Sequence, residues 1–155
     1  MARWLGFSVL IIVLDQLTKV LAEANLVYAE PLAVLPSFNL TLLYNRGAAF
    51  SFLSDAGGWQ RWFFVAISFG ASAALIVWLR KLQPWQWRLA LALSLVIGGA
   101  VGNLIDRLWL GHVVDFIQVY YRSFYWPAFN IADSAITAGA VLLVWDSLFG
   151  RHPES

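Results

Sequence analysis

Cysteine is absent from this chain of 155 residues, and charged side chains are scarce. Without cysteine the chain has no disulfide, no thiolate metal site and no cysteine nucleophile. Charged residues make up 12% of the sequence, whereas typical soluble proteins have roughly 25%. The net charge of +1 is spread along the chain without a basic run, so no nucleic-acid-binding surface is indicated. With 61% hydrophobic residues, the composition is that of a membrane protein.

Histidine and the common catalytic motifs are also scarce. The two histidines, His112 and His152, fall on opposite sides of the topology predicted below, and the zinc-protease motif H-E-x-x-H does not occur. No metal site is therefore predicted. The G-x-S-x-G elbow is missing as well, and a serine–lysine pair could draw only on Lys19 and Lys81. The remaining catalytic groups are carboxylates, which require neither a metal nor another cofactor.

Four hydrophobic segments follow one another, at about 4–21, 62–79, 89–108 and 130–149. The second and third each carry an uncharged run close to the ~20 residues that cross a bilayer core. The first contains Asp15 and Lys19, and the fourth carries Asp133 and Asp146 near its ends. The sequence predicts an all-α integral membrane protein with four transmembrane helices, which form one membrane-embedded domain over residues 1–155.

The connection between the first two segments lacks the character of a membrane span. From Phe38 to Leu42 apolar residues alternate with polar ones, and the chain then reaches the turn sequence Asn45-Arg46-Gly47. Alternation of this kind is typical of a strand, and glycine favours a turn. We therefore expect a small hairpin-like β element within residues 38–53, outside the membrane and between helices 1 and 2.

The first segment has a second interpretation as a cleavable signal peptide. Arg3, the apolar run at 4–14 and the sequence AEA at 22–24 imitate the three regions of such a peptide. Asp15 and Lys19 are unusual between an apolar core and a cleavage site, and three more spanning segments follow. An uncleaved membrane anchor is the favoured interpretation.

Lysine and arginine in the short connections favour a cytoplasmic N-terminus. The cytoplasmic side then receives Arg3, Arg80, Lys81, Arg88 and Arg151, and the outer side receives Arg46, Arg61 and Arg122. Both chain termini lie in the cytoplasm in this orientation. The C-terminal ends of the first and third helices and the N-terminal end of the fourth then meet at the outer face.

Polar side chains gather at those three helix ends. Ionisable groups at membrane depth cost ~2.5–3.5 kcal/mol each and usually face the bundle interior with a partner. Two pairs, Asp15–Lys19 and Asp106–Arg107, can be explained as structural ion pairs. The residues that converge are Asp15, Lys19, Asn103, Asp106, Arg107, Asn130 and Asp133, with Asp115 in the connection that follows helix 3.

Asn130 and Asp133 also have a structural interpretation, because they match a helix N-cap and an acid at its N3 position. Asp115 has the weakest one, since its neighbours are apolar and aromatic and no basic residue is near in sequence. Two aspartates that share one proton have their pKa values driven apart, so that one activates water while the other polarises a carbonyl group. Aspartic-type hydrolysis is the chemistry that these residues favour.

Five ordered motifs resemble those of lipoprotein signal peptidase, the bacterial signal peptidase II. They are DQLTK at 15–19, YNRGAAFSFL at 44–53, GGAVGNLIDRL at 98–108, HVVDF at 112–116 and FNIADSAI at 129–136. The resemblance covers nearly the whole chain. It implies an inner-membrane aspartic endopeptidase that removes the signal peptide from a diacylglyceryl-modified prolipoprotein, just before the lipidated cysteine.

The resemblance also implies roles for individual residues. Asp115 and Asp133 would be the catalytic pair, without a metal or cofactor, and the partners would be the lipid-modified prolipoprotein and membrane lipids. Apart from the resemblance, we hypothesise that the connection at 109–127 is a mobile lid over the substrate. Site-supporting or substrate-positioning roles fall to Asp15, Lys19, Asn45, Gly47, Asn103, Asp106, Arg107 and Asn130.

Two other functions remain open from the sequence. A non-enzymatic four-helix protein could use the buried acids as a proton relay or as packing pairs, although a relay would distribute its acids across the membrane. A protease with the same chemistry could instead cleave ordinary transmembrane helices.

Overall fold

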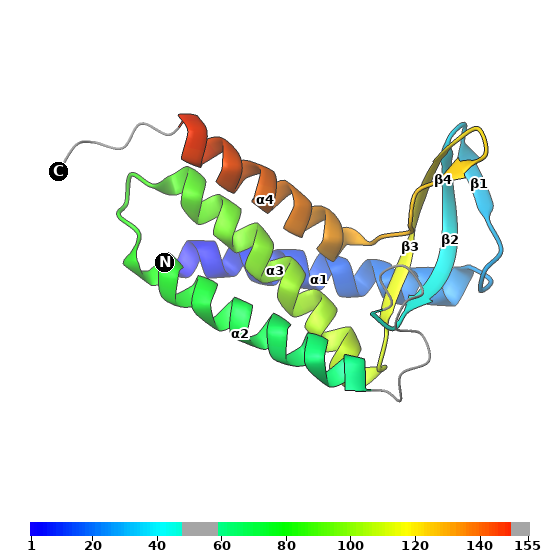
Figure 1. The fold of residues 1–155 in the computed structure, drawn as a ribbon, viewed down its shortest axis with the longest axis horizontal. Coiled ribbons are helices and arrows are strands. Elements are labelled where there is room, and N and C mark those ends of the chain that lie inside the picture. The colour runs from blue at the N-terminus through cyan, green and yellow to red at the C-terminus, as the bar shows by residue number, and fades with distance from the viewer. Residues whose placement is uncertain (48–58, 150–155) are drawn as a thin grey trace.

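The computed structural model describes residues 1–47 and 59–149. Within these ranges the chain forms four helices and a four-stranded sheet, and the sheet lies at one end of the helix bundle (Figure 1). All four helices are long and apolar enough to cross a membrane, which confirms the four-helix part of the predicted fold. In chain order the elements are α1 (Ala2–Asn25), β1 (Leu32–Leu35), β2 (Phe38–Asn45), α2 (Trp59–Lys81), α3 (Trp87–Trp109), β3 (Val113–Tyr121), β4 (Phe124–Tyr125) and α4 (Ile131–Phe149).

Helices α1, α2 and α3 extend up to four residues beyond the hydrophobic segments from which they were predicted. Helix α4 begins one residue later than predicted. The difference is largest in α1, which continues to Asn25 although Asp15 and Lys19 interrupt its apolar sequence. Both of these charged side chains are buried within the bundle. Because both side chains have polar partners inside the bundle, the helix continues beyond the apolar part of its sequence.

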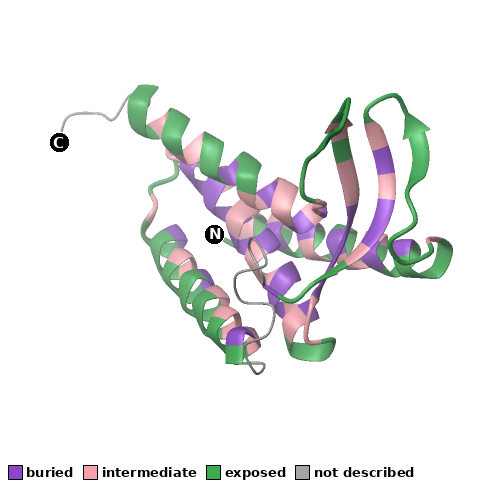
Figure 2. Cartoon of the chain, turned by 45° about the vertical axis from the view of Figure 1, so that its right-hand side comes forward, coloured by how far each residue is buried: buried purple, intermediate pink, exposed green. Residues whose placement is uncertain are grey.

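Helix α3 is the centre of the bundle and packs against α1, α2 and α4. It is the most buried helix, whereas α2 is largely exposed (Figure 2). Glycines allow the close approach of its neighbours. A Cβ atom at Gly98 would lie 2.8 Å from Ile11 Cβ, and one at Gly102 would lie 2.6 Å from Asp15 Oδ2. Small residues at such crossings bring helices of membrane proteins into contact.

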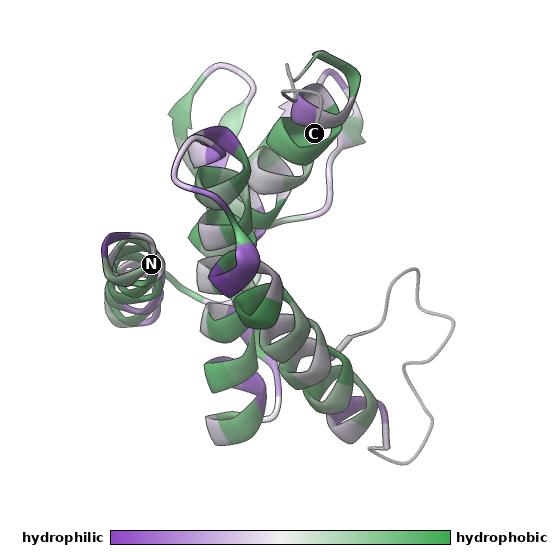
Figure 3. Cartoon of the chain, turned by 90° about the vertical axis from the view of Figure 1, so that its left-hand side faces the viewer, coloured by the Kyte–Doolittle hydropathy of each residue, from purple (hydrophilic) through white to green (hydrophobic). Residues whose placement is uncertain are grey.

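The bundle has two ends of different character. At the end where α1 begins and α2 joins α3, here called the termini end, the interior is largely apolar, apart from the buried Ser8, whose hydroxyl group donates to the Ser94 carbonyl oxygen at 2.8 Å. The helices are hydrophobic over most of their length (Figure 3). The opposite end carries the sheet and is called the sheet end. The buried residues of the apolar cluster at the termini end are Leu79, Leu89, Ala90, Leu93 and Ile97.

The sheet contains strands from two connections, whereas the β element was predicted within one. Its strands run antiparallel in the order β1-β2-β3-β4, so that β1 and β2 come from the α1–α2 connection, and β3 and β4 from the α3–α4 connection. The expectation of an element confined to the region between helices 1 and 2 was wrong, because the backbone groups of β2 pair with those of β3. Residue Leu43 of β2 lies opposite Asp115 of β3 in this register.

Two further expectations about the connections need correction. The hairpin turn lies at Pro36-Ser37, ahead of β2, where Ser37 has a φ of 67° and proline precedes it as in a type II turn. The chain does turn at Gly47, whose φ is 92°, but the rest of the predicted hairpin, from residue 48, lies outside the described residues. The expected lid at 109–127 is largely β3 and β4, paired within the sheet.

Candidate active site

Lys19 is the centre of a buried polar network at the sheet end. Its Nζ atom lies 2.8 Å from Asp15 Oδ2 and 2.8 Å from Asp106 Oδ2, and it donates a hydrogen bond of 3.0 Å to Asn103 Oδ1. The side chain is 2% exposed, and an ammonium group has three N–H donors. All three donors are therefore satisfied inside the protein. The predicted Asp15–Lys19 ion pair is present, with Asp106 as an additional partner.

The two carboxylates that contact Lys19 also bind backbone groups of other elements. Asp15 Oδ1 accepts the Ala132 N–H at the start of α4, at 2.9 Å. Asp106 Oδ2 accepts the Val114 N–H of β3, at 3.1 Å. Since a buried backbone donor needs a partner, these bonds fix where α4 and β3 begin. The network thus connects α1, α3, α4 and the sheet.

Asp106 and Arg107 do not form the ion pair that their adjacency predicted. Consecutive residues of a helix point ~100° apart, and Asp106 faces Lys19 while Arg107 faces α2. The guanidinium of Arg107 lies over the Phe64 ring, 5.3 Å from its centroid, and donates to the Asn103 carbonyl oxygen at 3.3 Å. Asp133 is the acid with which Arg107 interacts most strongly. Arg107 therefore contributes positive charge beside Asp133.

Asn130 caps helix α4, as predicted, and also binds Asp115. Its Oδ1 accepts the Asp133 N–H at 2.8 Å, which confirms it as the N-cap of α4. Its Nδ2 donates to Asp115 Oδ1 at 2.7 Å, and lies 3.1 Å from the Val114 carbonyl oxygen and 3.2 Å from Asn103 Oδ1. The side chain is fully buried. One amide group thereby sets the relative positions of Asp115 and of the helix turn that carries Asp133.

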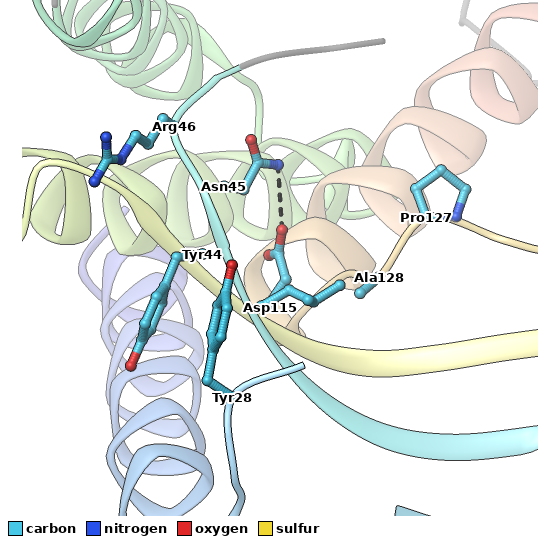
Figure 4. Close-up of a pocket in the computed structure, with 8 residues that line it drawn as sticks. Tyr28, Tyr44, Asn45, Arg46, Asp115, Pro127 and Ala128 are labelled. Carbon is cyan, nitrogen blue, oxygen red and sulfur yellow. Dashed lines mark hydrogen bonds between the residues drawn. The ribbon is translucent and has the colours of Figure 1, made fainter. Parts of the chain in front are cut away.

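The carboxylates of Asp115 and Asp133 are each held by asparagine side chains. Asp115 accepts the bond from Asn130 on one oxygen and a bond from Asn45 Nδ2, at 3.2 Å, on the other (Figure 4). Asp133 Oδ1 accepts a bond from Asn103 Nδ2 at 2.7 Å. These amides orient the two carboxyl groups without supplying a formal positive charge.

Burial makes the Asp115 carboxyl group a weaker acid than an ordinary aspartate. The pKa of its carboxyl group is raised to about 7, chiefly by burial and then by the negative charge of Asp133, against the lowering effects of Asn45, Lys19 and Asn130. The negative charge of Asp133 thus lies close enough to the Asp115 carboxyl group to raise its pKa. Near neutral pH the Asp115 carboxyl group can therefore carry a proton, and a protonated carboxyl group near a second acid is the arrangement that aspartic-type hydrolysis uses.

A cleft of about 410 Å³ opens beside Asp115. Figure 4 shows it between the end of β2 and the segment that leads into α4. Tyr28 and Tyr44 stack along one wall, with their ring centroids 5.2 Å apart. A substrate segment could therefore reach the otherwise buried carboxyl group from this side. The lining residues are Tyr28, Leu43, Tyr44, Asn45, Arg46, Asp115, Pro127 and Ala128.

Gly47 completes the set of predicted site residues. Its N–H donates to Asn45 Oδ1 at 2.9 Å, which leaves the Asn45 amide nitrogen directed at Asp115. A residue with a Cβ atom would be strained at this φ and would collide with Phe64. All ten predicted residues thus lie in one connected region. Within residues 1–47 and 59–149, no cluster of three metal-ligating side chains occurs.

The sequence did not single out every member of the site. Gln16 Nε2 donates to Asp106 Oδ1 at 2.8 Å and to the Gly102 carbonyl oxygen at 3.2 Å. Its position inside the DQLTK motif, three residues before Lys19 on the helix, was the available signal. Arg46 likewise lies inside the YNRGAAFSFL motif. Tyr28 had no such signal, because its place in the cleft depends on how the sheet packs.

Four helices able to span a membrane, Asp115 of the adjoining sheet lining an open cleft and Asp133 in the first turn of α4 are together typical of a membrane enzyme that uses carboxylate chemistry. The family model described as "Signal peptidase (SPase) II" matches residues 7–149. The chain belongs to this family.

Close relatives and solved structures agree with this assignment. A lipoprotein signal peptidase of Teredinibacter turnerae is 57% identical over 96% of this chain and 88% of its own length. One from Acinetobacter baumannii is 58% identical over 94% and 83%. A solved bacterial membrane enzyme has a TM-score of 0.85 and 32% identity, covering 97% of this chain and 96% of its own. A second, with a TM-score of 0.81 and 31% identity, covers 100% and 95%.

Proposed function

We propose that this protein is an aspartic endopeptidase that removes signal peptides from diacylglyceryl-modified prolipoproteins, cutting just before the lipidated cysteine. Membership of the signal peptidase II family and the names of the relatives support the reaction and its prolipoprotein substrate. The observation that carries the proposal is the pair Asp115 and Asp133, held by asparagines beside a cleft, with the pKa of Asp115 raised to about 7.

In the proposed mechanism the two aspartates share one proton. The raised pKa of Asp115 assigns that proton to its carboxyl group near neutral pH, so Asp115 donates a hydrogen bond to the scissile carbonyl oxygen. Asp133 takes a proton from the attacking water. The developing oxyanion is stabilised by the hydrogen bond from Asp115, whose side chain is buried and borders the cleft. As the tetrahedral intermediate collapses, Asp133 donates the proton that it took from water to the leaving amine, which breaks the peptide bond and restores both acids.

The other polar residues have supporting roles in this proposal. Asn45, Asn103 and Asn130 orient the two acids, and Gly47 orients Asn45. The Lys19 network holds the helices and β3 in register. These roles fall to Asp15, Lys19 and Asp106, together with Arg107, whose charge lies beside Asp133.

We place the protein in the bacterial inner membrane with both termini in the cytoplasm, as one membrane-embedded domain. The active site then faces the periplasm, where exported substrates emerge. The concentration of Arg3, Arg80, Lys81 and Arg88 at the termini end supports this orientation. Reporter fusions test it directly: those placed after Gln83 and at the C-terminus should read cytoplasmic, and one within residues 54–58 should read exported. A periplasmic reading after Gln83 would reverse the orientation.

The contacts of α1 support an uncleaved anchor instead of a signal peptide. Removal of the chain up to residue 24 would take away Asp15 and Lys19, which bind α3 and α4. The clustering of the acids also argues against a proton relay. Asp15, Asp106 and Asp133 all lie at the sheet end, whereas a relay needs groups at several depths.

The decisive experiment compares two substrates with the purified protein. A prolipoprotein that carries diacylglyceryl on its cysteine should be cleaved before that cysteine, and the same precursor without the lipid should be cleaved poorly. Equal cleavage of both would indicate a protease for ordinary transmembrane segments. Absence of cleavage in both, with correctly folded protein, would favour the non-enzymatic alternative.

A further inference from the structure

A second cavity lies at the termini end, at the far end of the bundle from the aspartates. Its volume is about 250 Å³, and it is enclosed by the start of α1, the end of α2 and the connection to α3. These segments lie together at the left of Figure 1. Arginine, tryptophan and glutamine side chains line it, together with one proline of the connection. These residues are Arg3, Trp4, Arg80, Gln83, Pro84 and Trp87.

Two arginines from different helices line this cavity, and no acid among residues 1–47 and 59–149 forms an ion pair with either. Within the described part of the chain, neither Arg3 nor Arg80 forms an ion pair, because the ion pairs found there all involve Lys19 at the sheet end. No carboxylate is among the residues that line the cavity. Two like charges that border one cavity repel each other unless an anion lies between them. The cavity is therefore positively charged and suited to an anionic ligand.

The surroundings of the cavity match the depth of lipid headgroups. Trp4 and Trp87 line it, and tryptophan is enriched at the boundary between the membrane and water. The Arg3 guanidinium lies 5.0 Å from the centroid of the Trp4 ring, a stacking contact that leaves its N–H groups available at the ring edge. Basic pockets between helices at this level are typical binding sites for anionic headgroups.

We propose that this cavity binds the phosphate group of an anionic ligand, and that a phospholipid headgroup supplies it. The planar guanidinium groups of Arg3 and Arg80 match the geometry of phosphate oxygens, and the Gln83 amide adds a neutral donor. A volume below the roughly 300–1,000 Å³ of pockets for drug-sized ligands fits a phosphoglycerol headgroup, while the acyl chains remain in the bilayer. The bound phosphate would join the start of α1 to the end of α2 and the connection to α3. This inference does not depend on the proteolytic function.

Thermal unfolding of the purified protein in an uncharged detergent tests the proposal. We expect phosphatidylglycerol to raise the melting temperature by roughly 5–10 °C relative to phosphatidylcholine when it is present at about 100 times its Kd. The double variant Arg3→Gln, Arg80→Gln should bind about 25-fold more weakly, since each cation contributes roughly 5-fold. Its melting temperature in phosphatidylcholine reports whether it folds.

A matched control separates the cavity from general surface charge. The double variant Lys81→Gln, Arg88→Gln removes the same net charge at the same end of the bundle, and neither residue lines the cavity. It should keep the response to phosphatidylglycerol. Equal loss in both double variants would overturn the proposal in favour of nonspecific attraction. If the Arg3–Arg80 double variant does not fold, the adjacent single variants Arg80→Gln and Lys81→Gln provide the same contrast.

Inorganic phosphate distinguishes the two sources of the anion. Phosphate at the concentration of the lipid should give a much smaller rise in melting temperature, because it lacks the acyl chains that concentrate the headgroup at the membrane surface. An equal rise that the Arg3 and Arg80 substitutions abolish would show a site for free anions and overturn the assignment to a lipid.

Discussion

The two ends of the helix bundle are held together by different kinds of contact, although α3 runs through both. At the termini end, Leu89, Leu93 and Ile97 of α3 pack in an apolar cluster. At the sheet end, Asn103 and Asp106 of the same helix are buried in a polar network. Apolar contacts tolerate exchange among side chains of similar volume, whereas a buried charge requires its particular partner. We therefore expect the sheet end to tolerate fewer amino-acid substitutions than the termini end.

The largest expected effect comes from the paired acids at the sheet end. Asp115→Asn and Asp133→Asn preserve side-chain size but cannot exchange a proton, so each should lower cleavage by at least ~10³-fold. Product formation should be measured together with a thermal melt and substrate binding, both of which should change little. Asp106→Asn should retain partial activity at reduced stability, because Asp106 binds Lys19 and the Val114 N–H. A fully inactive, stable Asp106→Asn with an active Asp115→Asn would mean that the catalytic pair is different.

A matched pair of methionine substitutions sharpens the contrast between the two ends. Lys19→Met leaves Asp15 and Asp106 without their shared cation and should destabilise the protein by ~3–5 kcal/mol. Leu93→Met, at an equally buried position of the termini end, should cost less than about 1.5 kcal/mol. Unfolding of both variants under identical detergent conditions measures the difference. Equal destabilisation would contradict the distinct character of the sheet end.

The raised pKa of Asp115 predicts a pH dependence that belongs to the sheet end. The folded state holds this proton up to about pH 7, whereas an unfolded aspartate releases it near ~3.9. The resulting stabilisation is fully present below pH ~4 and is lost as the pH rises through about 7. The melting temperature should therefore fall less steeply over this range in Asp115→Asn than in the parent. Cleavage by the parent should also decline above pH 7, as the shared proton is lost.

The smallest expected effect concerns Asn45, which lowers the pKa of Asp115 through its hydrogen bond. Asn45→Ala should raise that pKa, so the decline of cleavage at alkaline pH should move to higher pH while the protein stays folded. A pH–rate profile measures the shift. Thr41→Val is the control, since Thr41 bonds Gln118 in the same sheet without contacting Asp115. A downward shift in Asn45→Ala would contradict the role assigned to this bond.

The sequence predicted the helices and the polar residues well, because charge inside an apolar segment is visible locally. It could not show which charged groups pair across the bundle. Lys19 and Asp106 are far apart in sequence and meet only when α1 packs on α3, so the adjacent Arg107 looked like the natural partner. The sheet was hidden for the same reason, since β2 and β3 come from different connections. Asn130 was predicted as a cap from its local pattern, but its bond to Asp115 again depends on the fold.

The bond from the Ala132 N–H to Asp15 joins the first helix to the last. Ribosomes deliver a chain from its N-terminus, so the carboxylate of Asp15 emerges long before its partner on α4 exists. Asp133 is likewise placed by the Asn130 cap at the start of α4. A nascent chain that has inserted its first three helices thus lacks half of the acidic pair and the final contact of its polar network. If Asp115 and Asp133 form the proposed catalytic pair, the enzyme would be inactive throughout its own translation and would acquire activity in the last step of membrane insertion.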